Sequence, residues 1–203
     1  MPIATNLRQI VPRLWSWHAY DPAVKVDLFS CALEFEGGLV LVDPIGLDEW
    51  GMKTLASQGP VRAIVVTNAN HARQSAEFKR FWNAPVLTHR DAVVELETPV
   101  DGLLQAGDFL GGGIEVLELP GAGAGEIALY DQTGRIHFGD AVVNLESTGL
   151  CLLPEKYCSN PAQLKNSVAA LGGLKADVIT FAHGVPLVGQ FKDGMDLIVS
   201  LAR

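Results

Sequence analysis

Hydrophobic and polar positions alternate along much of this chain in the pattern of short β-strands. The runs Leu28 to Glu36 and Leu39 to Asp43 are separated by Gly37-Gly38, which predicts a hairpin. The run Arg62 to Thr67 is short and largely apolar, and it predicts a strand that is buried on both faces. Further strands are expected over Ile114 to Leu119, Ile127 to Asp131, Arg135 to Phe138 and Val178 to Phe181.

Helical patterns lie between and after these strands. The residues from Ser75 to Trp82 place apolar side chains at helical spacing, so residues 62–82 are expected to form a strand–loop–helix unit. A second helix is predicted over 161–171, because Asn160 is a good N-cap and Pro161 suits the first helical position. A third helix is predicted over Met195 to Leu201. Hairpins and strand–helix units therefore combine in a mixed α/β chain.

Composition and charge narrow the class of protein. Of 203 residues, 48% are hydrophobic and 19% charged, and no linker or repeat is visible, so we expect one domain over residues 1–203. The formal charge of −8 provides no basic field, which excludes a general binder of nucleic acid or of anionic membranes. No apolar run reaches the ~20 residues of a membrane span and the first residues lack a secretion signal, so a cytoplasmic location is expected.

Several common functional motifs are absent from the sequence. The stretch Gly121 to Gly125 lacks the G-x-G-x-x-G spacing, and the residues after it alternate like a strand, which argues against dinucleotide binding. Neither a P-loop nor a G-x-S-x-G nucleophile elbow occurs. The three cysteines fit neither a disulfide framework nor a structural zinc site, so reduced thiols are expected.

Polar side chains follow three of the predicted strands. Four residues after one strand lies His71, and two residues after two others lie Asp140 and His183. Loops at strand ends gather at one edge of a sheet, where α/β proteins build their sites. These three side chains are therefore candidates for one site.

The strand-end loops, in chain order, are similar to those of the metallo-β-lactamase superfamily over roughly residues 25–190. The segments that carry the resemblance are Val42-Asp43-Pro44, Val66 to Arg73, Leu119 to Glu126, Phe138-Gly139-Asp140 and Ala182-His183-Gly184. The resemblance implies an α/β fold, a four-layer αβ/βα sandwich, whose loops at one sheet edge hold one or two metal ions, usually zinc. It also implies hydrolysis of an ester, thioester, amide or phosphoester.

The chain departs from the family motif at most of the metal-ligand positions. Where the family has H-x-H-x-D-H, residues 68–73 read Asn-Ala-Asn-His-Ala-Arg. The family's ligands are replaced at Asn68, Asn70, Ala72, Arg73 and Ala122. Asp140 and His183 match family ligands, Asp43 matches an aspartate that supports the ligands from behind, and His71 falls on a non-ligand position.

These replacements weaken the expected metal site. Asparagine offers only a weak amide oxygen, whereas a zinc site takes at least three stronger donors from the protein. The two-metal site is therefore expected to be largely lost. At most one divalent cation (zinc, iron or manganese) is expected, held by Asp140, His183 and His71 with an asparagine oxygen, and no other cofactor. Asp140 and His71 are the candidate catalytic residues.

Arg73 suggests a substitute for the lost charge. We predict that its guanidinium pairs with Asp140, because a carboxylate in an emptied pocket needs a partner. The helix that begins near Arg73 is expected to point its N-terminus at the same loop. A small carboxylate or phosphate would then bind in a cleft formed by Asn68, Asn70, His71, Arg73, Asp140 and His183. The alternative is that these groups only cap the helix.

Three functions remain open on the sequence alone. The chain is a hydrolase with one metal or none, a non-catalytic binder of a small anion, or a structural or interaction protein such as a homodimer. The aromatic group Trp15, Trp17 and Tyr20 is expected in the core or at a dimer contact rather than in a substrate wall, with Trp15 and Trp17 on one face of an edge strand. His137 and His89 are expected at the surface or as helix caps.

Overall fold

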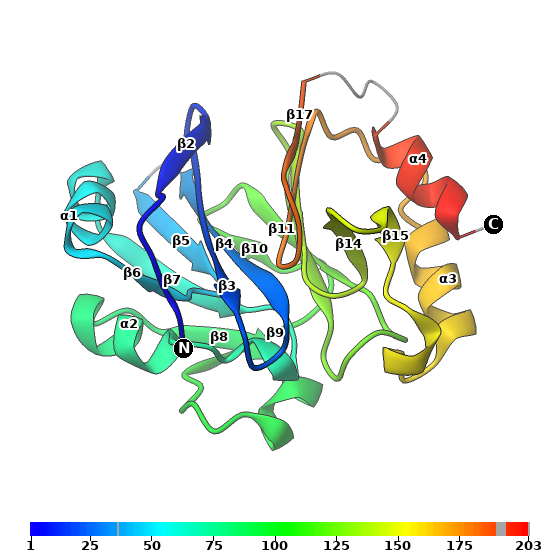
Figure 1. Cartoon of the computed structure of the whole chain (residues 1–203), viewed down its shortest axis with the longest axis horizontal. Helices are drawn as coiled ribbons and strands as arrows, with labels where there is room; N and C mark the ends of the chain where they lie inside the picture. The colour runs from blue at the N-terminus through cyan, green and yellow to red at the C-terminus, as the bar shows by residue number, and fades with distance from the viewer. Residues whose placement is uncertain (36, 190–193, 203) are drawn as a thin grey trace.

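Two large β-sheets face each other at the centre of the molecule, and a pair of helices covers the outer face of each sheet (Figure 1). The structure is a computed structural model that describes residues 1–35, 37–189 and 194–202. Glu36, at the end of the first predicted strand, therefore lies outside the described residues.

The first sheet contains seven strands in the order β2-β3-β4-β5-β7-β8-β9. Strands β2 to β5 pair antiparallel, and the predicted hairpin is the β4–β5 pair. From β5 to β9 the pairing is parallel. The strands are β2 (Arg8–Val11), β3 (Leu14–Asp21), β4 (Val26–Phe35), β5 (Gly38–Val42), β7 (Val61–Val66), β8 (Val86–His89) and β9 (Gly102–Leu104).

The second sheet contains six strands in the order β10-β11-β12-β13-β16-β17. Its one parallel pair joins β13 to β16, so both of these strands end at the same edge. The strands are β10 (Phe109–Leu110), β11 (Ile114–Glu118), β12 (Ile127–Asp131), β13 (Arg135–Phe138), β16 (Val178–Phe181) and β17 (Leu187–Val188). Two small sheets pair β1 (Ile3–Ala4) with β6 (Gly46–Leu47), and β14 (Val142–Leu145) with β15 (Gly149–Leu152).

The helices are short. The α-helices are α1 (Glu49–Gln58), α2 (Ser75–Trp82), α3 (Pro161–Ala169) and α4 (Gly194–Leu201), and the 3-10 helices are η1 (Ala69–His71), η2 (Arg90–Glu95) and η3 (Glu155–Tyr157). The predicted start of α3 is confirmed, because the Asn160 side chain accepts a hydrogen bond from the backbone N–H of Gln163. Within the described part of the chain, no helix is both long and apolar enough to span a membrane.

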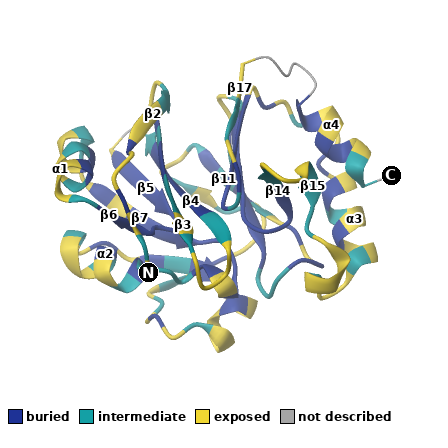
Figure 2. Cartoon of the chain, viewed as in Figure 1, coloured by how far each residue is buried: buried dark blue, intermediate teal, exposed yellow. Residues whose placement is uncertain are grey.

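Three buried clusters separate four layers, in the order helix, sheet, sheet, helix (Figure 2). Leu55 of α1 and Phe78 of α2 pack on the outer face of the first sheet. Leu164 of α3 and Ile198 of α4 pack on the outer face of the second. The third cluster lies between the two sheets. The expected four-layer αβ/βα sandwich is therefore present, and burial of these apolar faces is the main force that holds the layers together.

Two expectations about single residues are wrong. Strand β3 is not an edge strand, because β2 pairs with its outer side, and Ser16 on its other face is buried. Trp15 and Trp17 do pack in one cluster, as expected for core residues, whereas Tyr20 is 56% exposed and lies outside that cluster. His137 is neither exposed nor a cap: it is 1% exposed in β13, and this strand lies between β12 and β16. His89 does cap η2, since its Nδ1 accepts from the N–H of Asp91.

Candidate functional site

The candidate site lies where the ends of strands from both sheets meet. Asp43 follows β5, and η1 follows β7, so both lie at one edge of the parallel part of the first sheet. Asp140 and His183 follow β13 and β16, which end together at one edge of the second sheet. The two edges are joined directly, because the N–H of Ile127 donates to the carbonyl of Thr67 at 2.9 Å.

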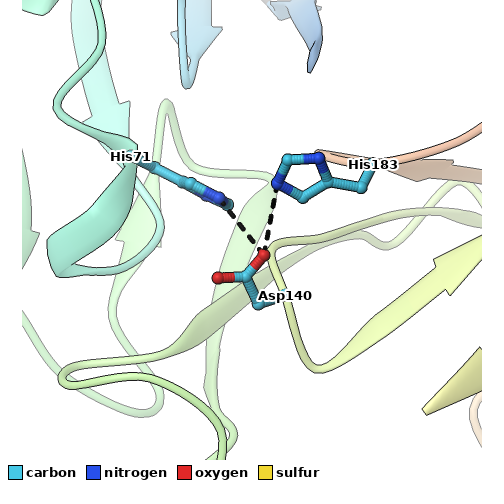
Figure 3. Close-up of side chains that lie close together, drawn as sticks. All are labelled: His71, Asp140 and His183. Carbon is cyan, nitrogen blue, oxygen red and sulfur yellow. Dashed lines mark ion pairs between the residues drawn. The ribbon is translucent and has the colours of Figure 1, made fainter. Parts of the chain in front are cut away.

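Three side chains converge at this junction (Figure 3). Nε2 of His71 lies 3.3 Å and Nε2 of His183 lies 3.4 Å from the same oxygen, Oδ1 of Asp140. The three ligand atoms all lie within 4.8 Å of one another. The structure thus brings together the three residues that were expected to share a site.

The ring of His71 is fixed from behind by Asp43. Its Nδ1 lies 2.9 Å from Oδ2 of Asp43, and a carboxylate can only accept, so Nδ1 carries the proton. Asp43 is itself held by the N–H and hydroxyl of Thr67. Nε2 of His71 is buried and makes no hydrogen bond among the described residues. This arrangement leaves Nε2 directed at Asp140.

His183 is oriented in the same way by a backbone group. Its Nδ1 donates to the carbonyl of Asp27 at 3.2 Å, because a carbonyl can only accept. Burial lowers the pKa of His183 to about 3, so the ring is neutral near pH 7 and its lone pair is on Nε2. Both histidines therefore present Nε2 to the same carboxylate oxygen.

The remaining charges of the site nearly balance. Burial alone would raise the pKa of Asp140, but the adjacent His71 holds it well below its usual range. Burial alone would lower the pKa of His71, but the charges of Asp140 and Asp43 raise it to about 9. Near pH 7, and without a cation, His71 is therefore an imidazolium between two carboxylates.

Asn68 acts as a hydrogen-bond donor in this structure. Its Nδ2 lies 2.7 Å from Oε2 of Glu126 and 3.1 Å from Oδ2 of Asp140. Its oxygen accepts from the N–H of Asn70 at 2.8 Å, which caps η1. Glu126 is 2% exposed; burial and the charge of Asp140 raise its pKa, and the N–H groups of Ala141 and Asn68, which favour the carboxylate, act against this rise. The Asn68 amide thus lies between two carboxyl groups.

The predicted ion pair between Arg73 and Asp140 is wrong. The guanidinium donates instead to the carbonyls of Phe29, Asp43 and Ala182. Among the described residues, Asp140 forms an ion pair with the charged His71, and Nε2 of the neutral His183 lies 3.4 Å from its Oδ1. The physical reason is that the carbonyl groups of Phe29 in β4, Asp43 after β5 and Ala182 after β16 meet at Arg73, and they accept from three of its N–H donors.

The predicted role of a helix N-terminus is also wrong. Helix α2 begins at Ser75, and the N–H of Ser75 donates to the carbonyl of Ala72. A cavity of about 610 Å³ opens above the site; Asn70 and Arg73 line it, but no residue of α2 does. The cap alternative describes Asn68 better, although it caps η1 and not α2.

The cavity is apolar around a polar floor. One wall is the β3–β4 hairpin with Val24 and Leu28, and the opposite wall includes Val143 of β14, Leu153 and Tyr157. The floor contains Asn70, His71, Arg73, Asp140 and His183. Such a cavity accepts a ligand with an apolar body and presents its polar groups at one point.

Two buried groups near the site were not predicted. Glu126 directly precedes β12, and its side chain reaches the N–H of Ala141, next to Asp140, because β12 runs antiparallel to β13. A search of the starts of antiparallel strands, in addition to the ends, would have found it. His137 lies deeper, with Nδ1 2.9 Å from Oγ1 of Thr180 and Nε2 3.9 Å from Oδ2 of Asp43. Nothing in the local sequence separates His137 from a half-exposed strand residue.

The donor set fits a single divalent cation. Two imidazoles and one carboxylate are a ligand set found in catalytic zinc sites and in non-haem iron sites. Each histidine also donates its other N–H to a carboxylate or a carbonyl, the arrangement that fixes metal-ligating histidines. The buried Nε2 of His71 without a hydrogen bond is a further sign of a missing partner.

Comparisons with known proteins agree with the resemblance seen in the sequence. The family model "Metallo-beta-lactamase superfamily" matches residues 7–203. A metallo-beta-lactamase from Pontibacter korlensis is 19% identical, with a TM-score of 0.73 over 97% of this chain and 98% of that one. The metallo-beta-lactamase FIM-1 from Pseudomonas aeruginosa, in its mono-zinc form, is 18% identical, with a TM-score of 0.73 over 99% and 95%. These likenesses show the fold. A comparison with curated proteins found no match.

Proposed function

Because the chain belongs to the metallo-beta-lactamase superfamily, we propose that it is a hydrolase that works with a single divalent cation. The observation that carries the proposal is the convergence of two Nε2 atoms on Oδ1 of Asp140, at 3.3 and 3.4 Å. His71, Asp140 and His183 are the residues that would hold the cation. Zinc, iron and manganese are the candidates.

The loss of a second metal is part of the same proposal. Ala72 and Ala122 have no donor atoms, and the Asn68 amide faces two carboxyl groups with its N–H groups. Arg73 places a permanent positive charge at the cavity, and this charge would repel a second cation. The donors that remain support one cation.

The chain's own residues supply orientation and shelter. Asp43 keeps one proton of His71 on Nδ1, and the Asp27 carbonyl keeps that of His183 on Nδ1, so Nε2 is the ligand atom of both rings. A cation bound here would take the place of the Nε2 proton of His71. The apolar cavity walls exclude water around the apolar part of a substrate. A divalent cation bound here would polarise a carbonyl or phosphoryl oxygen and lower the pKa of water.

The alternative of a non-catalytic anion binder has less support. Its main expected donor, Arg73, is already engaged by three carbonyl groups. His71 and His183, which lie in the polar floor, are directed at Asp140 and not at the open cavity. A hydrolase with an apolar substrate body uses both the floor and the walls of the cavity.

The proposal is tested by hydrolysis assays on protein loaded with Zn²⁺, Fe²⁺ or Mn²⁺. Model esters, thioesters, amides and phosphoesters with an apolar group are the substrates. We expect turnover of one class, reduced by more than about 100-fold in Asp140→Asn and in His71→Gln, because each change removes a ligand. His89→Gln is the matched control, since His89 caps η2, and it should keep full activity. Absence of turnover in every class, or full activity in His71→Gln, would contradict the proposal.

A further inference from the structure

Asn68, Glu126 and Asp140 are linked in a closed ring of hydrogen bonds behind the three convergent donors. We propose that Asn68 and Glu126 are positioning residues, which fix the Asp140 carboxylate so that its Oδ1 faces the two histidines. The inference rests on the proposed function, because it concerns how the same site holds a cation. It adds two residues that do not bind the cation themselves.

The ring begins at the Asn68 side chain and returns through the backbone. The two N–H groups of Nδ2 donate to Oε2 of Glu126 at 2.7 Å and to Oδ2 of Asp140 at 3.1 Å. The other oxygen of Glu126, Oε1, accepts from the N–H of Ala141 at 2.9 Å. Ala141 directly follows Asp140, so Glu126 holds the backbone of this residue pair and, through Asn68, its side chain.

Burial makes this ring stiff. Asn68 is 0% and Glu126 2% exposed, so water cannot replace their partners. A broken hydrogen bond would therefore leave a buried polar atom unpaired, which is costly. Glu126 fits here because residue 139 is a glycine. A Cβ on Gly139 would lie 2.6 Å from Oε1 of Glu126 and 2.7 Å from Oγ1 of Thr67. The absence of a side chain at Gly139 thus permits the contact.

The ring divides the two oxygens of Asp140 between two tasks. Oδ2 accepts from Asn68, and Oδ1 is left to the two Nε2 atoms. Glu126 does not line the cavity of about 610 Å³, so it acts on the site only through Asn68 and Asp140. Groups of this kind typically change metal affinity by about 10- to 100-fold when they are replaced.

Glu126→Gln is a sharp probe of the ring. Both oxygens of Glu126 accept a hydrogen bond, whereas glutamine has one acceptor and turns an N–H₂ group toward one of the two donors. Asn68→Leu is a second variant, which removes both N–H donors at once. Asp131→Asn is the matched control, because Asp131 is a buried acid at the opposite end of the same strand, β12, paired with Arg135.

The experiment is a titration of the metal-free, full-length protein with Co²⁺. Binding is monitored by calorimetry and by the visible absorption of the bound ion. We expect wild-type protein and Asp131→Asn to bind one Co²⁺ with the same spectrum. Glu126→Gln and Asn68→Leu should bind Co²⁺ about 10- to 100-fold more weakly and with an altered spectrum. Thermal unfolding of all four proteins measures their stability. A loss of stability that Asp131→Asn shares with the other two variants is general, and it does not explain weaker Co²⁺ binding in those two alone.

The imidazole ¹⁵N signals of the metal-free proteins provide a second readout. The signals of His71 and His183 should shift in Glu126→Gln and Asn68→Leu, and that of His89 should not. Wild-type affinity and spectrum in Glu126→Gln would overturn this inference and leave the proposed function intact. If wild-type protein binds no Co²⁺, the proposed function fails. Unchanged signals of His71 and His183 in both variants would overturn the inference, whether or not Co²⁺ binds.

Discussion

Arg73 shows how one side chain can join the two sheets at the site. Its guanidinium donates to the carbonyls of Phe29 and Asp43 from the first sheet, and to that of Ala182 from the second. Ala182 directly precedes His183, and Asp43 orients His71, so the same contacts hold the surroundings of both histidines. We interpret Arg73 as a stabilising cross-link whose charge also faces the cavity.

Replacement of Arg73 by methionine tests this interpretation. Methionine keeps much of the volume but leaves three carbonyls without their donor, so the free energy of unfolding should fall by about 2 kcal/mol. Denaturation in urea, followed by circular dichroism, measures the change. Arg80→Met is the control, because Arg80 is exposed on α2 and, in the part of the chain that the structure describes, its one ion pair is with Glu77 at 3.6 Å. Equal stability of the two variants would show that the cross-link contributes little.

The sequence identified some residues of the site and could not identify others. Asp140 and His183 could be found because each follows a strand by two residues and matches a family ligand. His71 could be placed near them, but not aimed at them, because its direction depends on Asp43, which lies 28 residues earlier. The partner predicted for Arg73 was wrong because a sequence does not show where backbone carbonyl groups will meet in the fold.

Strands and helices are held in place by a few side chains between elements. Asp101, just before β9, accepts from Lys79 of α2 at 2.6 Å and from the N–H of Val86 of β8 at 2.7 Å. The hydrogen bond and charge of Lys79, with the Val86 N–H, lower the pKa of Asp101. Asp101 thus links a helix to the parallel end of the first sheet.

The stabilisation by Asp101 should depend on pH. Because its pKa is lower in the folded protein than in the unfolded chain (~3.9), the contribution is present above about pH 4 and is lost as the pH falls through the folded value. Asp101→Asn should therefore lower the melting temperature at neutral pH, and the difference should shrink as the pH falls below the unfolded value. Thermal unfolding of both proteins across this range measures it. A difference that is the same at every pH would contradict this account.

At the scale of elements, local signals succeeded where they were strong. The strands β12, β13 and β16 lie where the sequence places them, and α3 begins at the predicted residue but ends at Ala169, two residues early. Helix α1 was not predicted, because its buried residues are only Gly51 and Leu55, too few to form an apolar stripe. The neighbours of β3 could not be read from its alternation, since pairing with β2 is a property of the sheet.

At the scale of the whole molecule, the site exists because two layers meet at one edge. Asp43 and His71 follow strands of the first sheet, and Asp140 and His183 follow strands of the second, so the proposed cation site would form only in the assembled sandwich. The sequence alone gave no order of strands; the four-layer arrangement was expected from the resemblance to a family. That ligands of the family are replaced in this chain at Asn68, Asn70, Ala72, Arg73 and Ala122 stays a prediction from the same resemblance.

The central claim is that this edge holds one divalent cation. Anomalous diffraction from crystals of the full-length protein, grown with Zn²⁺ and measured on both sides of the zinc absorption edge, tests it most directly. The account predicts a single peak bounded by Nε2 of His71, Nε2 of His183 and Oδ1 of Asp140. Two adjacent peaks at this edge, or no peak at these three atoms, would contradict it.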